Sequence, residues 1–148
     1  MCIRDRYLNL LRDLQREHGL ALIFITHNLG IVAKMCDQLA VMYAGRLVES
    51  GPVSRIFNAP AHPYTKALLN SIPRMSNWDQ RLTAIAGQPP DLSALPQGCA
   101  FAQRCPRAFD RCRNEAPPAF VLSDGQTARC WLPAEVGAEP AALVAGTA

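Results

Sequence analysis

The chain has 148 residues, of which 49% are hydrophobic and 18% charged, and its formal net charge is +3 at pH 7. This length suits about one domain with an apolar core, so the composition excludes a wholly disordered chain. The longest unbroken apolar runs are six residues and no apolar segment follows the charged N-terminus, which disfavours both a membrane-spanning and a secreted protein.

The first 36 residues predict two helices with a strand between them. Apolar residues recur at helical spacing over 7–18, and Gly19 is the kind of residue that follows a helix end. The continuous apolar run at 20–26 is typical of a strand buried on both faces of a parallel sheet. A second helix is expected at 29–36.

A hairpin is expected next. Residues 39–43 predict another buried strand, and a turn at 44–46 leads to a return strand at 47–49. We interpret Arg46 and Glu49 as surface side chains of this hairpin. The alternation of helix and strand predicts an α/β fold, and two or three strands cannot close such a sheet. The chain is therefore expected to be the tail of a larger α/β domain.

The sequence then becomes richer in proline. Pro52 predicts the start of a short helix, and Pro63 predicts the start of another that ends at Pro73. Residues 74–98 are expected to form a loop. The small residues of 137–148 predict a disordered tail.

Four cysteines form the most informative pattern, because they are separated by five, six and 17 residues and lie among four arginines. Arginines would offset the charge of metal-bound thiolates, and their N–H groups could reach the sulfurs. Nearby aromatic side chains could exclude water from such a site or pack an ordinary small core. The cysteines are Cys99, Cys105, Cys112 and Cys130; the arginines are Arg104, Arg107, Arg111 and Arg113; the aromatic residues are Phe101, Phe109 and Trp131.

Three kinds of site are compatible with this cysteine spacing. Disulfides are disfavoured because no export signal is present. A structural zinc site is possible, although zinc ligands usually come in pairs separated by two to four residues. An iron–sulfur cluster is the third candidate, since its four thiolates surround a larger inorganic core.

Two further stretches carry a resemblance to a known family. Residues 22–51, LIFITHNLGIVAKMCDQLAVMYAGRLVESG, resemble the last part of the ATP-binding subunit of an ABC transporter. Residues 56–73, IFNAPAHPYTKALLNSIP, resemble the C-terminal region of the oligopeptide and dipeptide importers. The resemblance implies the C-terminal part of a P-loop, ABC-type nucleotide-binding domain, followed by a small irregular cysteine-rich extension.

This resemblance assigns a role to His27, which directly follows the run at 20–26. The matching histidine of the family contacts the γ-phosphate of ATP and helps to organise the attacking water. By its position alone, His27 could instead be a loop residue that caps a helix. The sequence contains no G-x-x-x-x-G-K-[ST] phosphate-binding loop, and the family's signature and acidic strand-end motifs are also missing. ATP and Mg²⁺ are accordingly expected only in an intact subunit, and this chain is expected to be inactive alone.

The resemblance also ranks the metal sites. Importer ATPases of this family carry segments similar to GCAFAQRCPRAFDRC at 98–112, and some bind a [4Fe–4S] cluster there. Carried over, the implied ligands are Cys99, Cys105, Cys112 and Cys130, with zinc as the alternative. We expect no metal-binding role for Cys2, Cys36, His18 or His62, of which His62 should cap or pack at a helix start.

The expected organisation has four parts. Residues 1–6 are a doubtful leader, 7–58 belong to the ATPase domain, 59–135 form the importer-type region with the cysteines, and 136–148 are the tail. The implied function is to power import of di- or oligopeptides, or of nickel complexes.

The implied partners are a second ATPase subunit, two membrane permeases and, indirectly, a peptide-binding protein, at the cytoplasmic face of the bacterial inner membrane. No nucleic-acid partner is expected. The alternative is a stand-alone, metal-stapled protein-interaction module.

Overall fold

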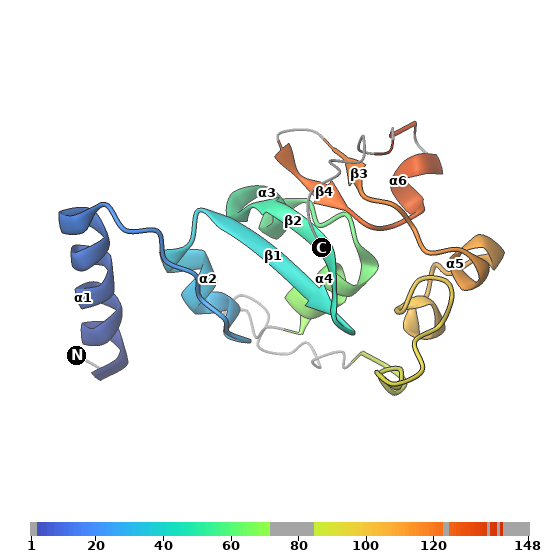
Figure 1. The fold of residues 1–148 in the computed structure, drawn as a ribbon, viewed down its shortest axis with the longest axis horizontal. Helices are drawn as coiled ribbons and strands as arrows, with labels where there is room; N and C mark the ends of the chain where they lie inside the picture. The colour runs from blue at the N-terminus through green and yellow to red at the C-terminus, as the bar shows by residue number, and fades with distance from the viewer. Residues whose placement is uncertain (1–2, 72–84, 123–124, 136, 139, 141–148) are drawn as a thin grey trace. The chain divides into compact units, whose positions relative to one another are not determined.

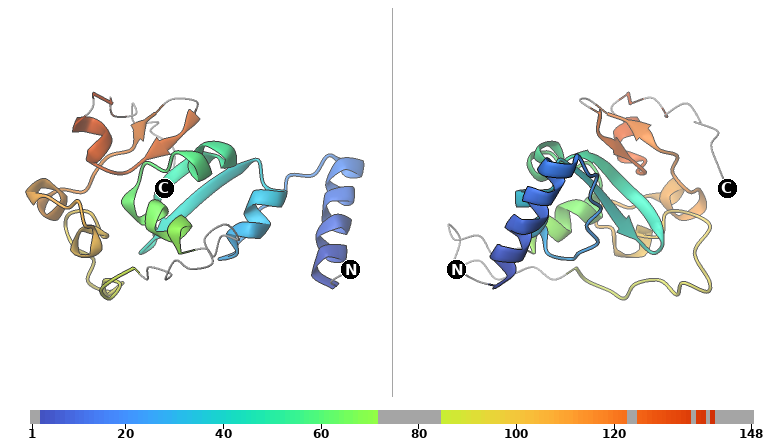
Figure 2. Two further views of the ribbon diagram at one scale, coloured as in Figure 1. Left: turned by 180° about the vertical axis from the view of Figure 1, so that it is seen from behind. Right: turned by 60° about the vertical axis from the view of Figure 1, so that its left-hand side comes forward.

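The computed structural model describes residues 3–71, 85–122, 125–135, 137–138 and 140. It divides into two compact units, residues 1–37 and 38–148, which are described separately below. Figures 1 and 2 show the helices and strands of each unit. Pro73 and most of the predicted tail lie outside the described residues.

The first unit contains two helices, as predicted. Helix α1 spans Ile3–His18 and is followed by Gly19 at a positive φ of 62°, a backbone conformation that favours glycine. Helix α2 spans Leu29–Met35. The Arg12 guanidinium of α1 donates to the backbone carbonyl of Lys34, at the end of α2. This contact connects the two helices.

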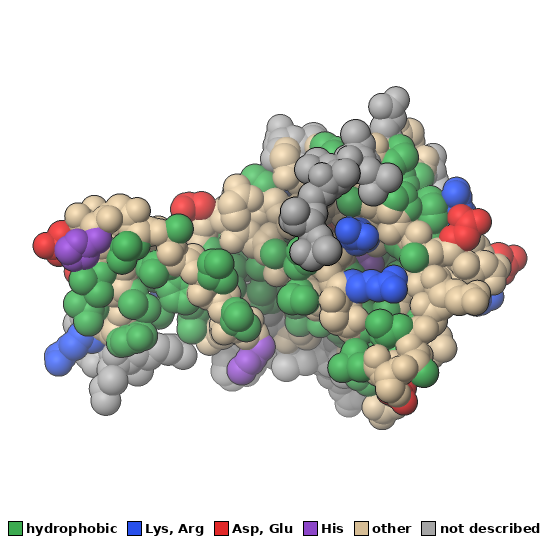
Figure 3. All heavy atoms as spheres, viewed as in Figure 1, with side chains coloured by type: hydrophobic (Ala, Val, Ile, Leu, Met, Phe, Trp, Pro, Cys, Tyr) green, Lys and Arg blue, Asp and Glu red, His purple; other side chains and the backbone are tan. Residues whose placement is uncertain are grey.

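The prediction of a buried strand at 20–26 is wrong for this structure. The segment is extended, but it forms no strand within the part of the chain that the structure describes. The side chains of Ile23 and Ile25 are 92% and 98% exposed. Figure 3 shows hydrophobic side chains on the surface of this unit. A strand needs at least one neighbouring strand for its hydrogen bonds, and this segment has no described partner strand.

The second unit is built on an antiparallel sheet of order β1-β2-β4-β3. Strands β1 (Gln38–Tyr43) and β2 (Arg46–Pro52) form the predicted hairpin. Its turn places Ala44 and Gly45 at φ values of 48° and 75°, as tight hairpin turns require. Buried and exposed side chains alternate toward the end of β1, so β1 is not the fully buried strand that was predicted.

Short elements complete this unit. Helices α3 (Val53–Asn58) and α4 (Pro63–Asn70) follow the hairpin and lie on one face of it (Figures 1 and 2). The rest are η2 (Ala102–Arg104), α5 (Asp110–Asn114), β3 (Phe120–Val121), β4 (Thr127–Ala128) and α6 (Leu132–Glu135). The described residues are thus mixed α/β with a small antiparallel sheet, in place of the expected part of a parallel one.

Two adjoining hydrophobic clusters belong to the core of the second unit. One contains Val41, Tyr43 and Val48 of the hairpin together with Phe101. The other combines side chains from the cysteine region and the last strands: Ala102, Cys112, Phe120 and Trp131. Cys99 packs against both clusters. The cysteine segment is therefore part of the core of this unit.

Candidate functional site

All four predicted cysteines line a single pocket, which we call the four-cysteine pocket. Its volume is about 10 Å³, which is just enough for one water-sized sphere. Most of the side chains that line the pocket are apolar, and nitrogen atoms occur only in those of His62, Arg107 and Trp131. The lining residues other than the cysteines are His62, Pro63, Phe101, Ala102, Arg107, Pro117, Trp131 and Leu132.

Backbone hydrogen bonds bring the first three cysteines together. The Cys99 N–H donates to the Cys112 carbonyl at 2.8 Å. The Cys99 carbonyl in turn accepts from the Ala102 N–H at 2.9 Å, at the start of η2. The next cysteine follows this short helix, and its N–H donates to the Ala102 carbonyl at 3.3 Å. The spacing of five and six residues thus corresponds to two tight turns around the pocket.

The close approach of these turns requires a glycine. A Cβ added at Gly98 would lie 2.3 Å from the Cys112 carbonyl oxygen and 2.5 Å from that of Arg113. No L side chain fits at that separation from the backbone. The glycine therefore allows the backbone just before Cys99 to lie directly against α5.

We expect Gly98→Ala to destabilise the pocket. The added methyl group must push the backbone away from Cys112, which should cost about 1–3 kcal/mol. Urea unfolding of the chain would measure the loss. Gly30→Ala is the control, since its Cβ would meet only the Asn28 side chain, at 3.1 Å. Equal stability losses for the two variants would contradict the requirement for a glycine at position 98.

The fourth cysteine reaches the pocket from a different segment. Cys130 lies between β4 and α6, and the N–H of Arg129 donates to the Val48 carbonyl of β2 at 2.8 Å. Strand pairing of β4 with β2 therefore fixes the position of Cys130. The sheet therefore positions Cys130, the fourth candidate ligand, at the pocket.

The thiols lie in an environment that disfavours bare thiolates. The pKa of Cys130 is raised to about 12, first by burial and then by the other three thiols nearby. Burial likewise raises the pKa of Cys99 and of Cys105. Thiolates at these positions therefore need a compensating positive charge, such as a metal ion would supply.

Backbone N–H groups partly meet that need at three of the sulfurs. In each case the N–H two residues after the cysteine lowers the thiol pKa, because a nearby donor favours the charged form. The donors are Phe101 for Cys99, Arg107 for Cys105 and Leu132 for Cys130. This repeated arrangement suits sulfur atoms that act as metal ligands.

The arginines divide their roles. Arg107 lines the pocket, and its charge lowers the pKa of Cys105. The other three arginines have partners elsewhere. All four were predicted to offset the thiolate charge, but among the described contacts only Arg107 does so. Arg104 donates to the Ile85 and Ala86 carbonyls, Arg111 pairs with Glu115 and stacks on the Trp131 ring at 3.7 Å, and Arg113 pairs with Asp110.

The three predicted aromatic residues all pack near the cysteines. Phe101 is 1% exposed and, with Trp131, lines the pocket. Phe109 packs against the cluster that includes Cys112. The Trp131 Nε1 donates to the Glu115 carbonyl at 3.1 Å, so this ring is fixed in place. The packing interpretation is confirmed for all three rings, and Phe101 and Trp131 also line the pocket.

The interpretation of Glu49 as a surface residue is wrong. The residue is 2% exposed, and its carboxylate accepts from the Ala61 N–H at 2.8 Å and from the His62 N–H at 3.0 Å. The Gln126 side-chain amide donates to the same carboxylate at 2.7 Å. Glu49 thereby joins β2, the start of α4 and the segment before β4. Arg46 is exposed, as predicted.

His62 fulfils its predicted capping role and has a second feature that the sequence did not indicate. Its Nδ1 accepts from the Tyr64 N–H at 3.0 Å and caps α4. The ring is buried, lines the four-cysteine pocket and packs at 5.8 Å from the Phe101 ring centroid. Its Nε2 is buried and has no hydrogen-bond partner among the described residues. Burial lowers its pKa to about 4.

The donor set fits a thiolate-bound group, but no metal geometry is preformed. The described cysteines, which exclude Cys2, form no disulfide. Among the described residues, no group of three or more His, Cys, Asp or Glu side chains is arranged to hold a metal ion. Zinc would require the four sulfurs to lie about 3.8 Å apart around one tetrahedral centre. The thiols therefore share a pocket without converging on one point.

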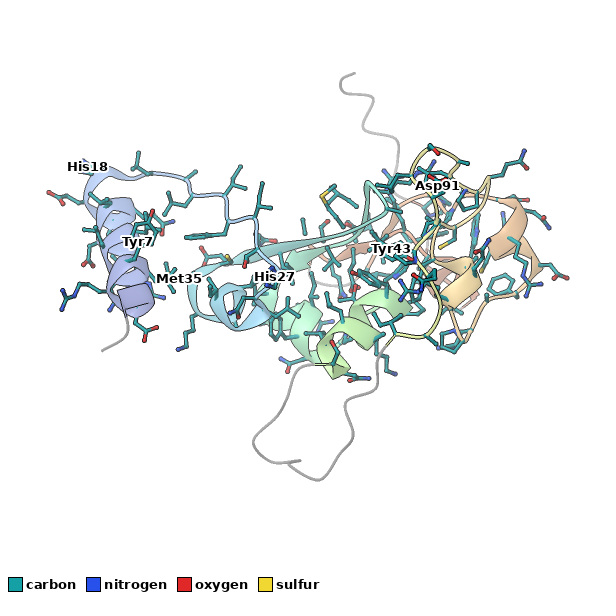
Figure 4. All side chains as sticks on the ribbon, turned by 90° about the horizontal axis from the view of Figure 1, so that it is seen from below. Tyr7, His18, His27, Met35, Tyr43 and Asp91 are labelled. Carbon is teal, nitrogen blue, oxygen red and sulfur yellow. The ribbon has the colours of Figure 1, made fainter. Side chains whose placement is uncertain are left out.

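His27 lies in the first unit, at the point where the extended segment meets α2 (Figure 4). Its side chain is exposed. The residues beside it have structural roles: Asn28 caps α2 through its Oδ1, which accepts from Gly30 at 3.0 Å, and the Thr26 hydroxyl accepts from the Asn28 N–H. The cap orders the backbone around His27 and leaves the imidazole available.

Comparison with known proteins supports the sequence resemblance. Residues 48–112 match the family model described as the oligopeptide/dipeptide transporter C-terminal region. The chain is 44% identical over 133 residues to the oligopeptide transport ATP-binding protein OppD of Haemophilus influenzae, covering 90% of this chain and 41% of the relative. It is 45% identical over 130 residues to the dipeptide transport ATP-binding protein DppD of Bacillus subtilis, covering 88% and 39%.

The chain spans about two fifths of the length of these relatives. No helix in the described ranges is long and apolar enough to cross a membrane. The match includes the hairpin strand β2, the capped helix α4 and three of the four pocket cysteines. Residues 48–112 thus match the C-terminal region of the oligopeptide and dipeptide transporters, and the chain around them is similar to part of the ATP-binding subunits of peptide ABC transporters.

Proposed function

We propose that this chain is the C-terminal part of the ATP-hydrolysing subunit of an importer for di- or oligopeptides, or for nickel complexes. The names of its relatives, oligopeptide and dipeptide transport ATP-binding proteins, support the peptide class. The subunit would use ATP and Mg²⁺ and act with a second ATPase subunit and two membrane permeases, which a peptide-binding protein supplies. It would lie at the cytoplasmic face of the bacterial inner membrane.

In such a subunit, His27 would contact the γ-phosphate of ATP, and residues 20–26 would form a strand of the nucleotide-binding sheet. The high exposure of Ile23 and Ile25 supports a role for this segment as a buried strand in a larger sheet. The 148-residue chain alone is expected not to hydrolyse ATP.

We expect His27→Ala, introduced into a subunit that contains the phosphate-binding loop, to lower the rate of ATP hydrolysis by about 10²–10³-fold. ATP binding should remain nearly unchanged, because the histidine acts chiefly on the charge that develops in the transition state. Hydrolysis and nucleotide binding would be measured on the same preparation. Asn28→Ser, which preserves the helix cap, is the control, and a normal rate for His27→Ala would overturn the role.

We infer that the four-cysteine pocket holds a [4Fe–4S] cluster, with Cys99, Cys105, Cys112 and Cys130 as ligands. One observation carries this proposal: four cysteines from two segments of the chain line one pocket. When bound, the cluster would act as a covalent staple for a small, proline-rich region.

Metal analysis of the 148-residue chain, purified without oxygen, tests this inference. About four irons per chain, with broad visible absorption that dithionite bleaches, are expected. One zinc per chain and no colour would overturn the cluster and make the site a structural zinc clip. The proposal of a transporter subunit does not depend on this outcome.

A further inference from the structure

The His62 side chain presents an unexplained hydrogen-bond donor beside the four-cysteine pocket. The residue is 1% exposed, lines the pocket and has a buried Nε2 with no partner in the described part of the chain. Buried polar groups of native proteins nearly always have a partner, so such a group calls for an explanation. The neighbouring Phe101 ring, at 5.8 Å between centroids, offers only its π-surface.

The hydrogen bonds around the ring decide which nitrogen carries the proton. The Nδ1 accepts from the Tyr64 N–H at 3.0 Å and therefore cannot carry a hydrogen itself. The neutral imidazole must have its proton on Nε2. Burial favours the neutral form, as the low pKa of about 4 also indicates. The unpartnered atom is consequently an N–H group in a pocket whose other polar atoms include four sulfurs.

We propose that the Nε2–H of His62 donates a hydrogen bond to a sulfur atom of the group held in the four-cysteine pocket. This proposal rests on the proposed cofactor. Sulfur atoms of an iron–sulfur cluster accept such bonds, and donors near them raise the reduction potential because they stabilise the more negative, reduced state. The same side chain caps α4 through Nδ1, so it would couple that helix to the cofactor.

Two substitutions separate the capping role from the donor role. In His62→Asn the side-chain oxygen can replace Nδ1 as the cap acceptor, but the side chain is too short to reach the Nε2 position. In His62→Gln the amide nitrogen can replace Nε2 as the donor, but a good cap is lost. If His62 had only a structural role, the midpoint potential would change more in His62→Gln than in His62→Asn.

The test is the midpoint potential of the cluster in the anaerobically purified 148-residue chain, with iron content measured on each sample. We expect His62→Asn to retain iron and to lower the midpoint potential by roughly 59 mV. For a one-electron couple this corresponds to about a tenfold change in the reduction equilibrium constant. His62→Gln should have the wild-type potential and a lower unfolding temperature. Unchanged potentials in both variants, or loss of iron from both, would overturn the donor role.

The two proposals fail in different ways. If the wild-type chain holds zinc, the cluster is overturned, and the donor is then tested with Co²⁺ in place of zinc. His62→Asn should shift the thiolate-to-cobalt absorption band while His62→Gln does not, and identical bands in all three proteins would overturn the donor role. A wild-type chain that holds neither iron nor zinc overturns both proposals.

Discussion

Replacing Cys130 with serine is expected to abolish cofactor binding by the four-cysteine pocket. Serine preserves the size of the side chain but removes the thiolate, and the remaining three ligands come from a single short segment. Changes to groups that only support a metal ligand commonly cost 10–100-fold in affinity, so loss of a ligand should cost roughly 100-fold or more. Iron content and the visible spectrum of the purified chain would report the loss.

Cys36→Ser is the matched control for this experiment. Cys36 is a half-buried thiol that immediately follows α2 and does not line the pocket. The variant should retain the full iron content of the wild-type chain. If Cys130→Ser retained its iron, or if both variants lost it equally, the assignment of Cys130 as a ligand would be wrong.

Removal of the Glu49 carboxylate is expected to cause the largest loss of stability in the second unit. Glu49→Ala would leave the N–H groups of Ala61 and His62 and the Gln126 amide without their acceptor in a buried site. Each buried donor left unsatisfied costs about 1–3 kcal/mol, so we expect a loss of about 3–5 kcal/mol in the free energy of unfolding. Urea titration followed by tryptophan fluorescence, with Trp131 as a buried reporter, would measure it.

Two further variants make this prediction sharp. Glu49→Gln keeps one acceptor oxygen and should lose about 1–3 kcal/mol, which remains measurable if the alanine variant fails to fold. Glu115→Gln removes a carboxylate from an exposed ion pair with Arg111 and should change stability by less than about 1 kcal/mol. Equal effects of the glutamine substitutions at the two positions would contradict a buried network at Glu49.

Elements defined by neighbouring residues could be predicted from the sequence. The helices α1 and α2 follow from apolar spacing and end signals, and the β1–β2 hairpin follows from its Ala-Gly turn. The strand predicted at 20–26 did not form, because a strand also needs partners that lie elsewhere. Glu49 was misplaced for a similar reason: its burial depends on β4, which pairs with it through Ala128.

The candidate site shows the same division. The cysteines were recognisable because residue type and spacing alone single them out, and the structure gathers all four around one pocket. Their role as ligands is a proposal that the metal analysis tests. The position of His62 beside them could not be predicted, since the cap motif indicates only what Nδ1 does. Tertiary packing decides which pocket the Nε2 side of the His62 ring faces.

The pairing of β2 with β4 has a consequence for the order of events during synthesis. The Ser50 and Thr127 hydroxyls, which lie 2.7 Å apart, are separated by 77 positions in the chain. The ribosome therefore releases Cys99, Cys105 and Cys112 before the strand that delivers Cys130. A nascent chain passes through a stage with three gathered thiols and an open fourth place, and sheet closure then completes the set. Pairing of β4 with β2 is therefore the step that brings Cys130 to the other three thiols.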